Sequence, residues 1–217
     1  MTIAETILQL YQTGGPVIAV LLLMSVIGLT IILAKSLQFA MNRIHRFREA
    51  RAAVELFLGG DREAARALVS GTRAPAARLT ALAIQGLDAG QISEPRLREE
   101  LTRVGNDELR ALRGGLRPLE LIAGLAPLLG LLGTVLGMIE AFQAMERDGS
   151  GVSPAVLSGG IWQALSTTAV GLGVAIPAVA ALSWLESRVE RLGQEMDSLV
   201  TRLFTQAPVN HSTPAAR

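Results

Sequence analysis

Three long stretches without a charged side chain dominate the sequence, and each is long enough to form a membrane-spanning helix. Their most apolar segments are 15–34, 121–139 and 161–185. Twenty helical residues rise about 30 Å, which is the thickness of the hydrocarbon core of a bilayer. One such helix could be buried in a soluble protein, but three in 217 residues indicate a bilayer. The pattern therefore predicts an all-α integral membrane protein with three transmembrane helices.

The segments between and after the spans are polar and helical in period. Residues 35–120 carry apolar side chains at intervals of three and four, with breaks that predict helices over 62–69, 75–87 and 93–116. We interpret this region as long helical extensions of the spans that form a small bundle, with little support for a separate folded domain. Residues 186–217 are predicted to form a further helix that ends in a disordered tail.

The distribution of Lys and Arg predicts the orientation in the membrane. Residues 1–14 contain none, residues 35–120 contain 15, and the connection at 140–160 contains only Arg147. Because loops rich in Lys and Arg stay in the cytoplasm, 35–120 and 186–217 are expected there. The N-terminus and the short 140–160 connection are then periplasmic. The first span is expected to be a retained anchor, since no basic residue precedes it.

Composition removes several classes of function. Half of the residues are apolar and the mean hydropathy is +0.40. There is no Cys and there are only two His, so a disulfide framework, a thiolate metal site or a His-based catalytic site is not expected. Aromatic residues do not interleave with the arginines, which argues against nucleic acid. We expect a protein that is not an enzyme and has no cofactor.

No ionisable side chain lies inside any of the three spans. Ion-coupled carriers usually need a titratable group near the middle of the membrane. A solitary solute carrier is therefore poorly supported, and the sequence has no inverted repeat that would suggest one. If the protein moves protons, another chain must supply the group that carries them.

The second and third spans are instead rich in small and hydroxylic residues. Small faces let membrane helices approach closely, so packing alone is one interpretation. Two threonines at similar depth on small-residue faces also suggest a polar channel lining. The candidate packing residues are Gly130, Gly133, Gly137, Gly171 and Pro177. The candidate proton-pathway residues are Thr134, Thr167, Thr168 and Gln163.

The segments GLAPLLGLLGTVLGMIEAF (124–142) and GGIWQALSTTAVGLGVAIPAVAA (159–181) resemble the MotA/TolQ/ExbB proton-channel family, and the ExbB/TolQ branch in particular. The resemblance implies a homopentameric ring in the bacterial inner membrane. Such a ring surrounds the single transmembrane helices of an ExbD- or TolR-like partner whose membrane Asp carries the proton. The family's functional threonines correspond to Thr134 and Thr168. Many relatives carry Glu where this chain has Gln163, and an amide cannot carry a proton.

The resemblance implies a proton-channel subunit of a motor that energises TonB-dependent transport across the outer membrane. A TolQ-like role in the Tol-Pal envelope-integrity system, which acts through a TolA-like protein, is the alternative within the family. A membrane scaffold that does not conduct is an alternative of another class. Such a scaffold would not need the two threonines.

Overall fold

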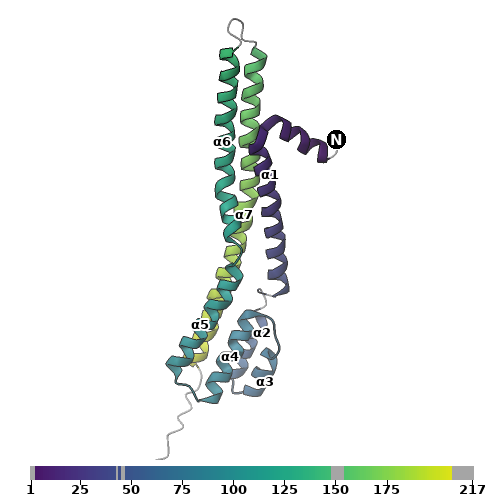
Figure 1. Ribbon diagram of the computed structural model, residues 1–217. Helices are drawn as coiled ribbons and strands as arrows, with labels where there is room; N and C mark the ends of the chain where they lie inside the picture. The colour runs from purple at the N-terminus through teal and green to yellow at the C-terminus, as the bar shows by residue number, and fades with distance from the viewer. Residues whose placement is uncertain (1–2, 43, 45–46, 148–153, 207–217) are drawn as a thin grey trace, which may run out of the picture. The chain divides into compact units, whose positions relative to one another are not determined.

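The computed structural model describes residues 3–42, 44, 47–147 and 154–206, and its regular elements there are all helices (Figure 1). They are α1 (Ile3–Met41), α2 (Arg48–Leu58), α3 (Arg62–Val69), α4 (Pro75–Ala89), α5 (Glu94–Arg113), α6 (Arg117–Arg147) and α7 (Pro154–Gln206). They belong to two compact units. The membrane unit comprises Met1–Lys35 with Gly115–Trp184, and the other unit, called the cytoplasmic unit after its predicted location, comprises Ser36–Gly114 with Leu185–Arg217.

The three predicted spans lie within the three helices α1, α6 and α7, which are long and apolar enough to cross a membrane. The all-α prediction with three spanning helices is thus confirmed. The helices continue past the predicted ends of the spans. In the 140–160 connection, α6 continues to Arg147 and α7 already begins at Pro154, whose fixed φ suits a first helical turn. Residues 148–153 and residues 207–217, where the disordered tail is predicted, lie outside the described residues.

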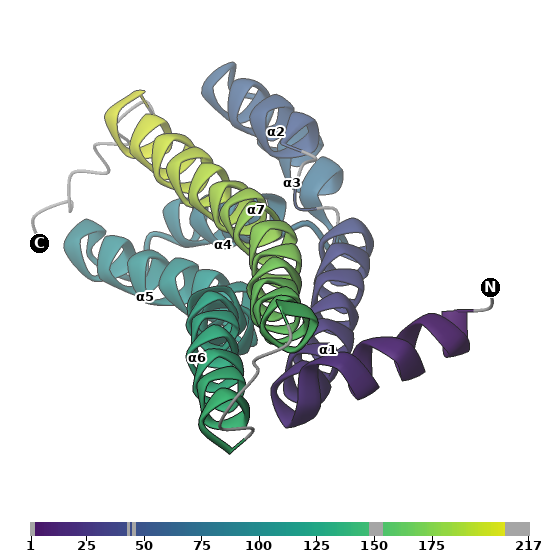
Figure 2. The same ribbon diagram turned by 90° about the horizontal axis from the view of Figure 1, so that it is seen from above.

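Helix α1 is bent at Gly15, where φ is +61° and ψ is −157°. Glycine adopts this left-handed φ without steric cost, and the ring of Pro16 disfavours a helical conformation for the residue before it. The helical segment before the bend turns away from α6 and α7 within the membrane unit (Figures 1 and 2). The sequence pattern did not predict this first helical segment.

The core of the membrane unit joins its three helices. Leu21 of α1, Ala126 of α6 and Ala175 of α7 form a buried apolar cluster, here called the three-helix cluster. Partly buried Val17, Met24, Leu129, Val170 and Val174 pack against it. Many large apolar side chains on the outside of these helices are exposed, and they require lipid or neighbouring protein around them.

The cytoplasmic unit has a core of its own. On α7 the buried residues recur at alternating intervals of four and three, at Leu185, Val189, Leu192, Met196, Leu199 and Leu203. This 3.5-residue period is typical of a helix that packs along its length against other helices. Helices α2, α3, α4 and α5 pack on one another in the same unit. Helix α7 extends from the third span into this unit, as the predicted helical extension requires. The unit is more compact than the sequence indicated, because much of its core is alanine, such as Ala50, Ala53, Ala65 and Ala77, which contrasts weakly with a polar surface.

Candidate functional site

Helices α6 and α7 meet along a seam of small residues. A β-carbon at Gly171 would lie 2.7 Å from the carbonyl oxygen of Ala126 and 2.9 Å from the α-carbon of Gly130. A β-carbon at Gly137 would lie 3.2 Å from that of Ala164. The two backbones therefore approach as closely as glycine allows, which is the packing expected where dispersion holds membrane helices together.

Thr167 belongs to this seam. Its side chain is 1% exposed and covers Gly133, where a β-carbon would lie 2.7 Å from that of Thr167. Its hydroxyl donates to the carbonyl oxygen of Gln163, one turn earlier, at 2.8 Å. Membrane threonines commonly satisfy their hydroxyl in this way. In this structure Thr167 fills the contact between α6 and α7, and its role in a proton pathway stays a prediction.

Thr134 and Thr168 are brought together at one depth, and we refer to them as the threonine pair. The Thr168 hydroxyl donates across the seam to the carbonyl oxygen of Gly130 at 2.9 Å. The Thr134 hydroxyl donates to the carbonyl oxygen of Leu131 at 2.6 Å. The two acceptors are consecutive residues of α6, separated by a rise of about 1.5 Å along its axis. Both hydroxyls are therefore held at nearly the same level, as the sequence suggested. The contribution of Gly130 as an acceptor was not foreseen.

The threonine pair faces away from α1. Leu129 and Val170 pack on the three-helix cluster, which contains Leu21 of α1. Thr134 follows Leu129 by five residues, and Thr168 precedes Val170 by two, so each lies about 140–160° around its helix from the residue that packs toward α1. Both threonines are only partly buried, so this flank is accessible within the single chain.

Gln163 does not join the threonine pair. It lies two turns before Val170 on the same face of α7, the face that packs toward the three-helix cluster. Five residues separate it from Thr168, which is about 140° around the helix. The structure thus places Gln163 and Thr168 on different flanks of the seam, and the sequence had grouped them in one pathway. Whether Gln163 lines a pore stays a prediction.

The surroundings of the threonine pair are electrically neutral. On α6 no charged residue falls between Glu120 and Glu140, and on α7 none falls between Pro154 and Leu185. Among the residues that the structure describes, no group of three His, Asp or Glu side chains could hold a metal ion. The site offers hydroxyl and carbonyl oxygens to a ligand and supplies no titratable group.

Ion pairs in the cytoplasmic unit tie α7 to α2. Arg51 donates two hydrogen bonds to Glu195, at 2.5 and 2.6 Å, and Arg202 donates to Glu55 at 2.6 Å. The hydrogen bonds from Arg51 hold the pKa of Glu195 below its usual value, and the same pair raises the pKa of Arg51. These contacts hold the unit together and are separate from the threonine pair.

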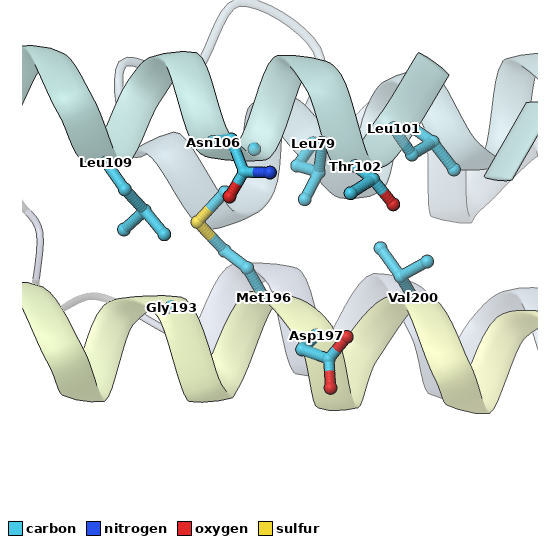
Figure 3. Close-up of a pocket in the computed structure, with 10 residues that line it drawn as sticks. Leu79, Leu101, Thr102, Asn106, Leu109, Gly193, Met196, Asp197 and Val200 are labelled. Carbon is cyan, nitrogen blue, oxygen red and sulfur yellow. The ribbon is translucent and has the colours of Figure 1, made fainter. Parts of the chain in front are cut away.

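A small hollow in the cytoplasmic unit lies between α5 and α7 (Figure 3). Its volume is about 100 Å³, and Asn106 of α5 and Met196 of α7 lie opposite each other across it. Other apolar lining comes from Leu79, Leu101, Leu109 and Val200. This space has room for a few water molecules, since each occupies about 30 Å³ in the liquid. Asp197 is its one ionisable lining residue, and all of its lining residues lie outside the membrane unit that carries the threonine pair.

The comparisons with known proteins all indicate the same family. The model of the MotA/TolQ/ExbB proton channel family matches residues 72–198. The chain is 29% identical to the biopolymer transport protein ExbB of Neisseria meningitidis serogroup B over 214 residues, which cover 90% of this chain and 94% of that protein.

Two shorter matches have higher identity. Over 96 residues the chain is 44% identical to the biopolymer transport protein exbB1 of Vibrio cholerae, covering 44% of this chain and 42% of that protein. Over 109 residues it is 38% identical to the Tol-Pal system protein TolQ of Haemophilus influenzae, covering 47% of this chain and 46% of that protein. These two alignments span less than half of each relative.

Proposed function

This chain belongs to the MotA/TolQ/ExbB proton channel family, and we propose that it is the proton-channel subunit of an inner-membrane motor that energises TonB-dependent transport across the outer membrane. In this role the proton-motive force moves the subunit ring against a partner, and the force is passed to a TonB-like protein. The protein acts in transport and contributes no catalytic residue of its own.

The observation that carries the proposal is the threonine pair in a membrane region without charge. Two hydroxyls are held at one depth on an accessible flank of α6 and α7, by hydrogen bonds of 2.6 and 2.9 Å. These hydroxyl groups can contact a proton carrier, but they cannot carry the proton themselves. We therefore propose that an ExbD- or TolR-like protein with one span supplies a membrane Asp, and that several copies of this chain surround it as a ring, a homopentamer by the family resemblance.

The exposed apolar surface of the membrane unit is consistent with this assembly. Leu128 on α6 is 60% exposed and Leu165 on α7 is 61% exposed, although both belong to spanning helices. Side chains of this kind must be covered by lipid or by other protein chains. In our proposal the flank with the threonine pair faces the partner, and other faces contact neighbouring copies and lipid.

Two other functions are distinguishable from this one. The similarity to TolQ favours a second candidate, a subunit of a Tol-Pal envelope-integrity motor. Neighbouring genes for a TonB-like protein and outer-membrane receptors support the first role, and genes for a TolA-like protein support the second. A scaffold that does not conduct would need neither the threonine pair nor a partner with a membrane Asp.

The test is reconstitution of the full chain in proteoliposomes, alone and with the one-span protein that co-purifies with it. We expect little proton flux from the chain alone, flux with the partner, and loss of flux when the partner's membrane Asp is changed to Asn. Thr134→Val and Thr168→Val should keep partner binding and reduce flux strongly, whereas Thr→Ser at either position should be milder. Robust flux from the chain alone, or normal flux in the double Val variant, would contradict the proposal.

The chain is a multi-pass membrane protein, and we further propose that its N-terminus is periplasmic and its C-terminus cytoplasmic. The distribution of Lys and Arg supports this orientation. It places the cytoplasmic unit on the side where the basic side chains of residues 35–120 would meet anionic lipid headgroups.

A further inference from the structure

A groove in the membrane unit lies between α1 and α7, next to the three-helix cluster. At the cluster, Leu21 of α1 and Ala175 of α7 belong to one buried core. Further along α1, small residues leave space between the two helices, and a β-carbon at Gly173 would have no atom within 4 Å. The groove has a volume of about 230 Å³. Its lining includes Met24, Gly28 and Ile32 of α1, Ile122 of α6, and Gly173 and Pro177 of α7.

The groove is apolar and opens to the outside of the membrane unit. Of the residues that line it, only Ser25 has a polar side chain. Gly173 and Pro177 are exposed, and Leu29 on the opposite wall is 58% exposed. All lining residues lie within the predicted spans, so the medium outside the groove is hydrocarbon. An open apolar groove at this depth must be filled by a lipid chain or by another protein chain.

The length of the groove matches one leaflet of a bilayer. From Met24 to Ile32, α1 rises about 12 Å. Lys35 follows after a further rise of about 4.5 Å. The sum, about 16 Å, is close to half of the hydrocarbon thickness of about 30 Å. A lipid chain that begins near Lys35 therefore reaches the far end of the groove at the middle of the membrane.

Cationic side chains lie at one end of the groove. Lys35 is one helical turn past Ile32, so the two residues are neighbours on the surface of α1. The Lys35 side chain lies against the start of α6, because a β-carbon at Gly115 would be 3.2 Å from its Cε and 3.8 Å from its Nζ. Exposed Arg117 and Glu120 follow in the first turn of α6, so this end holds two cations and one carboxylate. A lysine ammonium binds phosphate as a point charge.

The other end of the groove, at Met24, has no charge near it in the sequence of α1, since none falls between Glu5 and Lys35. The two ends thus differ as the two ends of a phospholipid differ. A helix of a second copy does not fit inside the groove, because a helix about 10 Å across fills roughly 900 Å³ over 12 Å of length. A single extended hydrocarbon chain fits both its length and its lining.

We propose that the groove binds one acyl chain of a membrane phospholipid whose phosphate group contacts Lys35. The lipid fills the space that the small residues leave between α1 and α7, and it packs against all three helices of the membrane unit. This inference goes beyond the proposed function and is independent of which motor the chain serves.

The experiment is native mass spectrometry of the full chain, purified in a mild detergent and titrated with synthetic phosphatidylglycerol of one defined mass. We expect wild type to retain one lipid per chain. Gly173→Leu places a side chain in the groove where glycine leaves space, and it should remove the retained lipid. Gly124→Leu is the matched control. A β-carbon at Gly124 also has nothing within 4 Å, but Gly124 does not line the groove, so this variant should bind lipid as wild type does.

Lys35→Gln tests the phosphate contact without changing the lining of the groove. Loss of the cation should weaken lipid binding about fivefold, whereas Lys35→Arg should bind nearly as wild type does. Equal lipid binding by Gly173→Leu and Gly124→Leu overturns the assignment of the groove. So does a wild-type chain that retains no lipid while Gly173→Leu loses its oligomer, because a second copy then fills the groove. Equal affinities of wild type and Lys35→Gln overturn the phosphate contact.

Discussion

Replacing Gly171 by alanine should destabilise the membrane unit although it adds only one methyl group. The new β-carbon would lie 2.7 Å from the carbonyl oxygen of Ala126 and 2.9 Å from the α-carbon of Gly130. Both are backbone atoms of α6, so no side chain can rotate to make room. The two helices must separate along the seam, which also lengthens the hydrogen bond from Thr168 to Gly130.

The size of the expected loss in stability follows from comparison with Gly173, two residues further along α7. A β-carbon at Gly173 has nothing within 4 Å, so Gly173→Ala is a matched control in the same helix. Alanine has a higher helix propensity than glycine by about 1 kcal/mol, and this gain is common to both variants. Overpacking costs typically about 1–3 kcal/mol. We therefore expect Gly171→Ala to be less stable than Gly173→Ala by about 1–3 kcal/mol.

The assay is unfolding of the protein in mixed micelles by titration with sodium dodecyl sulfate, followed by the fluorescence of Trp162 and Trp184. Both tryptophans lie on α7, so the signal reports on the helix that carries both substitutions. Native gels measure the oligomer in parallel. Equal free energies of unfolding for Gly171→Ala and Gly173→Ala would refute the close approach of α6 and α7 at this level.

Three further outcomes are expected. Glu195→Gln should remove a pH-dependent part of the stability of the cytoplasmic unit, about 0.2–1 kcal/mol. Because the native pKa of Glu195 is depressed below 4.5, wild type holds this advantage above about pH 4.5 and loses it as the pH falls through the native value. Unfolding titrations at several pH values measure it, and a difference between wild type and Glu195→Gln that stays the same at all pH values would contradict this expectation. Asp88→Asn should lower the free energy of unfolding by about 1–3 kcal/mol, because the side chain is 5% exposed and forms ion pairs with two arginines at 2.8 and 2.6 Å. An Asp88→Asn variant that unfolds at the same temperature as wild type would contradict this expectation. In intact cells treated with an impermeant maleimide that crosses the outer membrane, Gln143→Cys should be labelled and Gln91→Cys should not, and the reverse result would overturn the proposed orientation.

The sequence pattern was sufficient for the spanning helices and for most helices of the cytoplasmic unit. The prediction of a helix over 62–69 agrees with α3, and helices predicted at 75–87 and 93–116 differ from α4 and α5 by a few residues at their ends. Strong signals account for this agreement. Pro75 begins one helix, Gly90 ends it in the left-handed conformation, and Ser93 precedes the next.

The arrangement around the seam was harder to predict. Spacing along one helix shows that Thr167 and Thr168 point in different directions, but it does not show which of them α6 covers. The contact of Gly133 with Thr167 settles this, and it leaves Thr168 free to cross to Gly130. The flank on which Gln163 lies depends on which side of α7 packs toward α1. The sequence does not show that side, because it is defined by the contact of Val170 with the three-helix cluster.

The buried positions of α7 also restrict how the chain can change in length. Within the cytoplasmic unit they keep one rotational phase from Leu185 through Leu192 and Met196 to Leu203. Inserting one residue between Leu192 and Met196 would turn everything after it by about 100°, so the buried row beyond the insertion would lose its partners in this unit. Inserting seven residues would turn it by only about 20°. Insertions in this part of α7, whether natural or engineered, are therefore expected to be tolerated as whole heptads and not as single residues.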